Sequence, residues 1–146
     1  MREVVIELAT QADVAAIHRL EAESFPHPWK REFFENELRA SGRLSLVACR
    51  GTSLLGYLFA MWYFDELHVN KIAVAENERR HGIASALMHE CLRFARRQRI
   101  QQILLEVRKS NSGAQDFYRH LGFDPSYVRQ RYYPDGEAAV VMMRNL

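Results

Sequence analysis

The first candidate for chemistry in this sequence of 146 residues is the turn Arg79-Arg80-His81-Gly82. Backbone N–H groups at the start of a helix point outward, and the helix dipole attracts an anion. Gly82 lets a phosphate approach the backbone closely. The turn therefore predicts a pyrophosphate site, although a lone glycine beside solvated basic residues is more often an ordinary helix start.

The second candidate is Glu106, a carboxylate inside the apolar run Ile103-Leu104-Leu105-Glu106-Val107. A carboxylate is costly to bury unless it is hydrogen-bonded, paired or facing a wet cleft. It could serve as a general base. It could equally pair with Arg108, two residues further along the same face of a strand. The sequence alone leaves both interpretations open.

The third candidate is Tyr118, whose phenol could donate a proton. It shares an apolar stripe at helical spacing with Ala114, Phe117 and Leu121. An aromatic residue on such a stripe is more often part of the core than a catalytic group. Its type and position therefore permit both roles.

Metal and covalent chemistry find little support in the sequence. Cys49 and Cys91 form no metal-binding spacing, and we expect both to be buried free thiols among apolar neighbours. The histidines also lack ligand spacing. We expect no metal and no covalent intermediate.

The composition fits one ordinary folded domain. Hydrophobic residues make up 48% and charged residues 26%, which excludes a disordered or low-complexity protein. A net charge of +2 is too small to indicate a nucleic-acid partner. The longest apolar run, residues 54–64, is about half the length of a membrane-spanning helix, and the N-terminus lacks a signal-peptide pattern. We expect residues 1–146 to form a single cytoplasmic domain that does not enter a membrane.

Residue periodicity predicts the elements that must position these candidates. Residues 4–8 are typical of a strand, and Thr10 with Asp13 resembles a capping box that opens a helix. Pro26 and Pro28 must break this helix before a second one at residues 30–40. Residues 44–50 and 54–64 predict a β-hairpin, followed by a third strand at residues 68–75.

The second half alternates helices and strands. Apolar residues at helical spacing predict a helix from Gly82 onward, a strand at residues 100–107, and a second helix ending at Gly122. Residues 127–133 and 138–143 predict a closing hairpin around a turn at residues 134–136. We expect an α/β (α+β) fold with a mixed, mostly antiparallel sheet of about six or seven strands flanked by about four helices.

These segments, in this order, resemble the GNAT superfamily of acetyl-CoA-dependent N-acetyltransferases over nearly the whole chain. Residues 79–84 match its Gln/Arg-x-x-Gly-x-Gly/Ala pyrophosphate loop. Further segments resemble its N-terminal protein acetyltransferase branch, in particular the RimI-type ribosomal-protein alanine acetyltransferases. They are Leu105-Glu106-Val107-Arg108-Lys109-Ser110-Asn111, Phe117-Tyr118-Arg119-His120-Leu121-Gly122-Phe123 and Arg131-Tyr132-Tyr133-Pro134-Asp135-Gly136.

The resemblance implies how acetyl-CoA would bind. The backbone of Ile72, Ala73 and Val74 would hold the acetyl-pantetheine arm, and Asn111 and Tyr118 would add contacts to the cofactor. The pyrophosphate would bind the backbone amides of the loop residues Arg79, Arg80, His81, Gly82, Ile83 and Ala84.

The resemblance also implies the catalytic and substrate-binding residues. Glu106 would be the general base and Tyr118 the general acid. This chain departs from the close relatives at Ala138, where they usually carry an acidic residue, and at Lys71, where a small polar residue is common. The residues that would shape a peptide groove are Phe25, Pro28, Trp29, Tyr132 and Tyr133.

An α-amino group suits a modest base. Its reference pKa is about 7.7–8.0, so roughly a tenth is free amine at neutral pH, far more than for a lysine side chain. The amine would attack the thioester directly, and a strand amide near Val74 would stabilise the oxyanion. We therefore expect acetyl transfer through a ternary complex to the N-terminus of a protein. A small-subunit ribosomal protein is the best single interpretation, with the enzyme a monomer or weak dimer.

Two alternatives remain open from the sequence. The enzyme could acetylate lysines or small-molecule amines. In another functional class, the chain could be a non-catalytic acyl-CoA sensor, which would need residues 79–84 but would have no use for Glu106 together with Tyr118.

Overall fold

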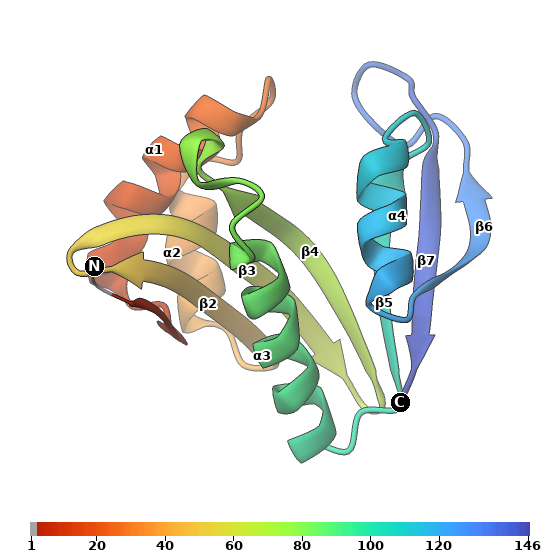
Figure 1. Cartoon of the computed structure of the whole chain (residues 1–146), viewed down its shortest axis with the longest axis horizontal. Coiled ribbons are helices and arrows are strands. Elements are labelled where there is room, and N and C mark those ends of the chain that lie inside the picture. Colours follow the sequence, from red (N-terminus) through yellow and green to blue (C-terminus); the bar gives the residue numbers. More distant parts are fainter. Residues whose placement is uncertain (1–2) are drawn as a thin grey trace.

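The computed structural model describes residues 3–146 and shows a seven-stranded sheet in these residues (Figure 1). The order across the sheet is β1-β2-β3-β4-β5-β7-β6. Within the described chain only β4 and β5 pair in parallel, so the expected mixed, mostly antiparallel sheet is confirmed. The strands are β1 Val4–Leu8, β2 Arg43–Arg50, β3 Ser53–Tyr63, β4 Glu66–Val74, β5 Gln102–Arg108, β6 Asp124–Arg129 and β7 Ala139–Asn145.

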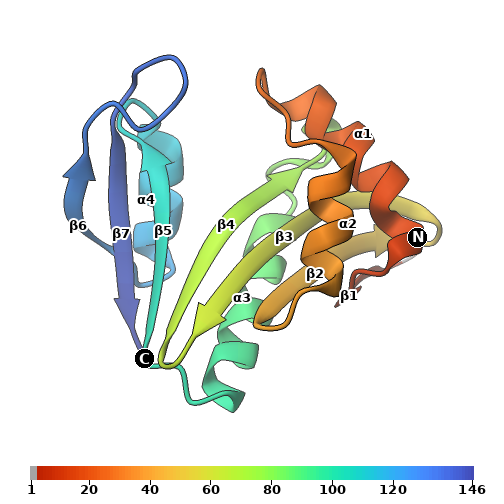
Figure 2. The same ribbon diagram turned by 180° about the vertical axis from the view of Figure 1, so that it is seen from behind.

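Helices cover both faces of the sheet. Helices α3 and α4 lie on the face seen in Figure 1, and α1 and α2 lie on the opposite face, seen in Figure 2. The described residues contain four α-helices, in the order expected from the sequence: α1 Val14–Ser24, α2 Arg31–Arg39, α3 Ile83–Arg97 and α4 Ser112–His120.

The apolar periodicity of the sequence accounts for two cores, one on each side of the sheet. The core beneath α3 and α4 includes Leu58, Leu87, Met88, Leu105 and Phe123. The core beneath α1 and α2 includes Ile17, Phe34, Val47, Tyr57 and Phe59.

The two cysteines differ in burial. Cys91 is a buried free thiol of α3, and burial raises its pKa to about 12. Cys49 is also free but only partly buried, so the expectation of full burial was wrong for this residue. It lies beside a register shift in β2, which disturbs the regular stacking of side chains there.

Local signals fixed several element ends as expected. The backbone N–H of Thr10 donates to the Asp13 carboxylate over 2.8 Å, which confirms the capping box. Gly122 has a φ of +87°, the left-handed conformation expected after α4. Among the helices of residues 3–146, none has the length and apolar character that a membrane crossing requires.

The last hairpin differs from the sequence prediction. Strand β6 ends at Arg129, so Tyr132 and Tyr133 lie in the loop before β7 and not in a strand. Arg131 has a φ of +52°, which breaks the extended path, and the N–H groups of both tyrosines donate to the carbonyl of Glu137. The tyrosines are therefore free to face the sheet from a loop.

Strands β4 and β5 diverge after a short paired stretch, as Figures 1 and 2 show. Residues 66–69 pair with residues 102–105, whereas β4 stays paired with β3 as far as Val74. A register shift leaves Asn70 without a partner on β3, and such a bulge bends a strand. Beyond it, the edge of β4 that faces β5 is open.

Candidate active site

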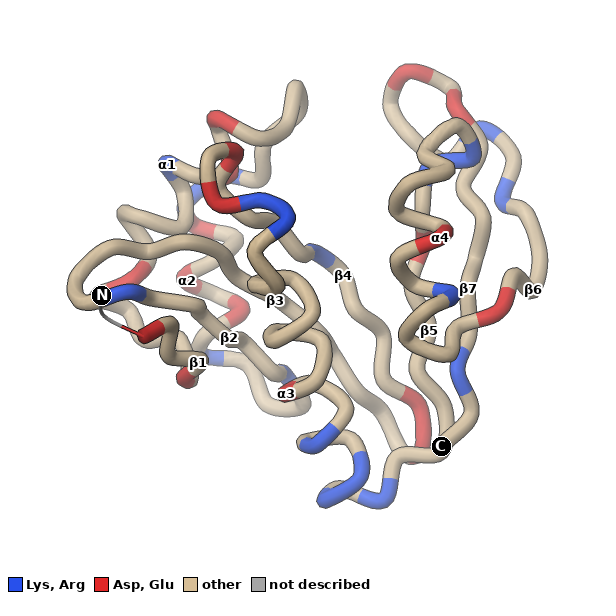
Figure 3. Tube along the Cα trace, in the orientation of Figure 1, with Lys and Arg blue, Asp and Glu red and all other residues tan. Residues whose placement is uncertain are grey.

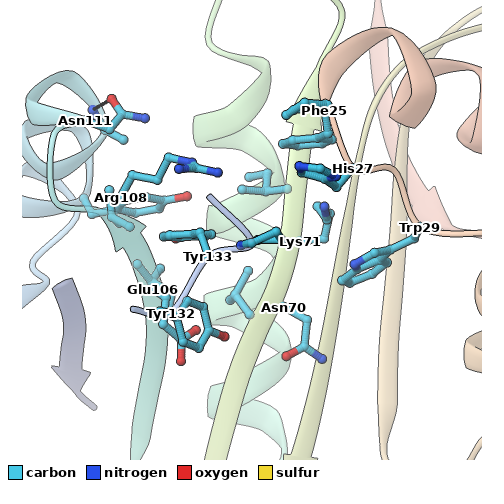
Figure 4. A pocket seen from close by; sticks show the side chains of 18 residues that line it. Phe25, His27, Trp29, Asn70, Lys71, Glu106, Arg108, Asn111, Tyr132 and Tyr133 are labelled. Atoms are coloured by element: carbon cyan, nitrogen blue, oxygen red, sulfur yellow. Dashed lines mark hydrogen bonds between the residues drawn. The ribbon is translucent and has the colours of Figure 1, made fainter. Parts of the chain in front are cut away.

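A pocket of about 680 Å³, the central pocket, opens where β4 and β5 diverge (Figure 4). Its walls come from the α1–α2 loop, β4, β5, the start of α4 and the β6–β7 loop. It brings together eight of the predicted site residues: Phe25, Trp29, Ile72, Glu106, Asn111, Tyr118, Tyr132 and Tyr133. The other predicted residues, Pro28, Ala73, Val74 and those at 79–84, are not part of its lining.

Glu106 projects from β5 into this pocket with only 9% of its side chain exposed. One carboxylate oxygen, Oε2, lies 2.5 Å from Nε2 of His68 on β4. The other, Oε1, lies 3.7 Å from Nε of Arg129 on β6. The carboxylate is therefore paired, but its partners are not Arg108, which the sequence had suggested.

Arg108 instead holds the β6–β7 loop against β5. Its Nη1 donates to Asp135 and to Glu137, each over 2.9 Å, and its guanidinium lies 4.1 Å from the centre of the Tyr133 ring. Hydrogen bonds from Ser110 and then from Arg108 lower the pKa of Glu137 to about 2. Glu137, the carboxylate next to Ala138, thus fixes the loop that carries Tyr132 and Tyr133.

A second ion pair fixes the opposite wall. Glu21 is fully buried and accepts hydrogen bonds from the backbone of Trp29 over 2.9 Å, from Nζ of Lys71 over 3.1 Å and from the Tyr57 hydroxyl. The Lys71 ammonium also lies 3.8 Å from the centre of the Phe25 ring and 4.5 Å from that of Trp29. The unusual Lys71 therefore ties the α1–α2 loop to β4.

The position of Tyr118 is compatible with both of the roles that the sequence left open, a core residue and a catalytic group. It is 7% exposed and packs against Phe117 and Phe123, yet it also lines the central pocket. Burial, and to a smaller extent Tyr133, raises its pKa well above the ordinary value. The phenol therefore stays protonated near neutral pH and suits hydrogen-bond donation.

The turn at residues 79–84 leads directly from β4 into α3. Arg80 and Gly82 have φ values of +67° and +79°, and Gly82 is the N-cap of the helix. The first bond of α3 runs from the Ala86 N–H to the Gly82 carbonyl, which leaves the preceding amides without intrahelical acceptors. Nε of Arg79 donates to the carbonyl of Val74 over 3.2 Å, which joins the turn to the open edge of β4.

This turn could hold an anion at one end of the open strand edge. Figure 3 shows its two arginines next to an acidic stretch that precedes them. Glu78 of that stretch is paired with Arg50 over 3.1 Å, which offsets part of its charge. Asn111, on the other side of the pocket, accepts a hydrogen bond from the Ala114 N–H over 3.1 Å and caps α4.

Sequence reasoning missed several residues of the site. His68, Arg129 and Glu21 were not singled out, although each contacts a predicted site residue. A polar His68 among apolar residues of an expected strand was a usable signal, since alternate strand residues share a face. Within residues 3–146, no group of three or more His, Cys, Asp or Glu side chains is arranged to hold a metal ion.

The fold and this pocket define an acetyltransferase of the GNAT type. The profile of the Acetyltransferase (GNAT) family matches residues 14–123, so the chain belongs to this family. The family resemblance inferred from the sequence is thereby confirmed.

Two relatives and one crystal structure show which members of the family this chain resembles. A Bacillus subtilis protein with the provisional name [ribosomal protein bS18]-alanine N-acetyltransferase is 30% identical over 132 residues, 89% of this chain and 87% of the relative. An N-alpha-acetyltransferase of Saccharolobus solfataricus is 31% identical over 158 residues, 99% of this chain and 95% of the relative. The crystal structure of the Escherichia coli ribosomal-protein-S18-alanine N-acetyltransferase superimposes with a TM-score of 0.91 at 25% identity, covering 98% of this chain and 94% of that one.

Proposed function

We propose that this protein transfers the acetyl group of acetyl-CoA to the N-terminal α-amine of a protein. The observation that carries the proposal is the central pocket, in which a paired carboxylate, Glu106, and a buried phenol, Tyr118, share one space between diverging strands. The names of the relatives, which include N-alpha-acetyltransferases, support the same acceptor.

Acetyl-CoA would lie along the open edge of β4. The outward amides of residues 79–84, with Arg79 and Arg80, suit the pyrophosphate. The backbone groups of the segment Ile72, Ala73 and Val74 that point away from β3 suit the amides of the pantetheine arm, because β4 has no strand partner on that side beyond Val69. The Val74 carbonyl already accepts a hydrogen bond from Nε of Arg79. Asn111 lines the pocket on the opposite side of this path.

Glu106 would take a proton from the α-amine, and the amine nitrogen would attack the thioester carbonyl. A backbone amide at the end of β4, near Val74, would stabilise the resulting oxyanion. When the intermediate collapses, the C–S bond breaks and Tyr118 donates its proton to the departing sulfur. No covalent intermediate on the protein is needed.

The acceptor would enter between two aromatic walls. Phe25 and Trp29 of the α1–α2 loop face Tyr132 and Tyr133 of the β6–β7 loop across the pocket (Figure 4). Such walls enclose an extended peptide and exclude water around its amine. Among possible acceptors, we propose the N-terminal alanine of a small-subunit ribosomal protein, because relatives from two bacteria carry names for that reaction.

The proposal is tested with purified protein, acetyl-CoA and peptides that begin with Ala, Ser or Met. A further peptide has a blocked N-terminus and an internal lysine. Tandem mass spectrometry should locate the acetyl group on the α-amine, with the Ala peptide reacting fastest. Acetylation of the lysine peptide alone would favour the lysine alternative, and acetyl-CoA binding without any product would favour the sensor.

The protein target is then identified in cells. Proteome-wide analysis of N-terminal peptides, with and without this protein, should show a loss of acetylation at one or a few N-termini, including that of a ribosomal protein. An unchanged set of acetylated N-termini would contradict the proposed target.

Replacing Trp29 or Tyr133 by alanine should raise the KM for peptide by roughly tenfold, because each substitution removes one aromatic contact to the acceptor. The KM for acetyl-CoA should change little, since neither residue is among those proposed to bind acetyl-CoA. Leu8→Ala, at an exposed position on β1, is the control and should match the wild type. Loss of acetyl-CoA binding in the Trp29 or Tyr133 variant would instead indicate that the ring only supports the fold.

A further inference from the structure

We propose that His68 is a positioning and proton-relay residue, through which Glu106 returns the proton taken from the substrate to the solvent. The proposal rests on the proposed function of the central pocket. It assigns a role to a residue that lies outside the lining of that pocket.

The geometry of the pair is fixed by the sheet. His68 lies opposite Leu104 in the short stretch where β4 and β5 still pair, just before the strands diverge. Its Nε2 is 2.5 Å from Oε2 of Glu106, so the two groups are in direct hydrogen-bond contact. Backbone pairing thus holds the imidazole against the carboxylate whether or not a substrate is bound.

His68 and Glu106 belong to two separate hollows. Glu106 lines the central pocket, whereas His68 lines a second hollow of about 320 Å³, the hairpin hollow, beside the β3–β4 turn. The two hollows share no lining residue. The imidazole is 31% exposed and the carboxylate only 9%. The other residues of the hairpin hollow are Met61, Trp62, Tyr63, Phe64, Asp65 and Glu66.

The reaction requires a route by which Glu106 passes a proton to the solvent. After the amine nitrogen forms the amide bond, Glu106 holds a proton that it must lose before the next turnover. When the α-ammonium form binds, two protons leave the nitrogen: one replaces the proton that Tyr118 gives to the thiol of CoA, and the other must reach water. In a ternary complex the peptide and acetyl-CoA fill the central pocket, so the exposed side of Glu106 is covered. His68 offers a route that neither substrate occupies.

One imidazole is sufficient to carry the proton from Glu106 to water. A proton passes from Oε2 of Glu106 to Nε2 of His68, which becomes an imidazolium. The imidazolium then releases the proton on Nδ1 to water in the hairpin hollow. Exchange of protons with water returns the ring to its starting tautomer, and no bond other than O–H and N–H changes.

The surroundings favour both charged forms of the pair. Arg129 lies 3.7 Å from the second oxygen of Glu106 and stabilises the carboxylate. Asp65 and Glu66 border the hairpin hollow and favour a transient imidazolium. Burial, and then Glu106, raises the pKa of Tyr132, so this phenol stays neutral. The charged and titratable groups around the pair are Tyr63, Asp65, Glu66, Arg129 and Tyr132.

The test measures kcat with an alanine peptide for the wild type, His68→Gln and His68→Ala, in weak buffer and with added imidazole. His68→Ala should lower kcat by roughly tenfold, and imidazole should restore most of it, because the hairpin hollow admits the free base from solvent. His68→Gln retains a donor to Glu106 but cannot carry a proton, so it should remain slow with or without imidazole, and any contribution of the imidazole side chain to the pH–rate profile should be lost.

Two controls separate the possible explanations. His89→Ala, on the exposed face of α3, should retain the wild-type rate and show no response to imidazole. Acetyl-CoA affinity, measured by calorimetry, should be unchanged in each His68 variant if the fold is intact. Wild-type rates and pH profiles in both His68 variants, or a slow His68→Ala that imidazole does not restore, would overturn the relay. A wild-type enzyme that acetylates no peptide would overturn the proposed function itself.

Discussion

Replacing Glu106 by glutamine is expected to lower kcat by roughly a hundredfold or more near neutral pH. Glutamine keeps the shape of the side chain and an oxygen that can accept a hydrogen bond from His68, which normally lies 2.5 Å from the carboxylate. It removes only the ability to take a proton. Because Glu106 is not among the residues proposed to bind acetyl-CoA, calorimetry should show nearly unchanged acetyl-CoA affinity.

The loss caused by Glu106→Gln should shrink as the pH rises. The reference pKa of an α-amine is about 7.7–8.0, so above this range the substrate arrives largely deprotonated and needs a base less. Steady-state rates from pH 6 to about pH 9.5 would measure this convergence. A variant with the wild-type rate and pH profile would show that positioning and oxyanion stabilisation alone drive the reaction.

Tyr118→Phe supplies the contrasting case. Burial raises the pKa of Tyr118, so the phenol remains a donor throughout this pH range. Without it, departure of the thiolate still lacks its proton at high pH, and the variant should stay slow where Glu106→Gln recovers. Parallel pH dependence of the two variants would contradict separate roles for base and acid.

The fold could be predicted from the sequence because the patterns that indicate its helices and strands involve residues close together in the chain. The apolar spacing of α3, the capping box at Thr10 and the left-handed Gly122 each depend on residues within one or two turns. The closing hairpin was predicted, but the end of its first strand was placed wrongly for the same reason. Alternation favoured a strand through Tyr133, but the loop conformation depends on Arg108, which lies on another strand.

The candidate site could be predicted only in part from the sequence, because the residues that interact there are far apart along the chain. Glu21 and Lys71 are 50 positions apart, and His68 and Glu106 are 38 apart. No periodicity links residues at such separations, so the nearest charge, Arg108, was the natural but mistaken partner for Glu106. The register of β4 against β5, which places His68 beside that carboxylate, depends on the whole sheet.

Gly82→Val is expected to weaken acetyl-CoA binding tenfold or more. At the φ of +79° that Gly82 adopts, a branched side chain is strained, and left-handed backbone costs ordinary residues roughly 1–2 kcal/mol. The free variant can relax out of this conformation and must then restore it to bind pyrophosphate, and a cost of about 1.4 kcal/mol on binding corresponds to tenfold in affinity. No protein atom lies within 4 Å of the added Cβ, so the effect arises from the backbone and from a side chain that covers the amides, and not from a clash inside the protein.

Gly136→Val is the matched control for this substitution. Gly136 has a φ of +89°, also with no atom within 4 Å of an added Cβ, but it lies in the β6–β7 loop beside the proposed peptide entrance. The same strain there should raise the KM for peptide and leave the calorimetric Kd for acetyl-CoA near the wild-type value. If the two valine variants weakened acetyl-CoA binding equally, the backbone strain would be acting by destabilising the whole fold. If Gly82→Val bound acetyl-CoA normally, the pyrophosphate would have to bind somewhere other than the turn before α3.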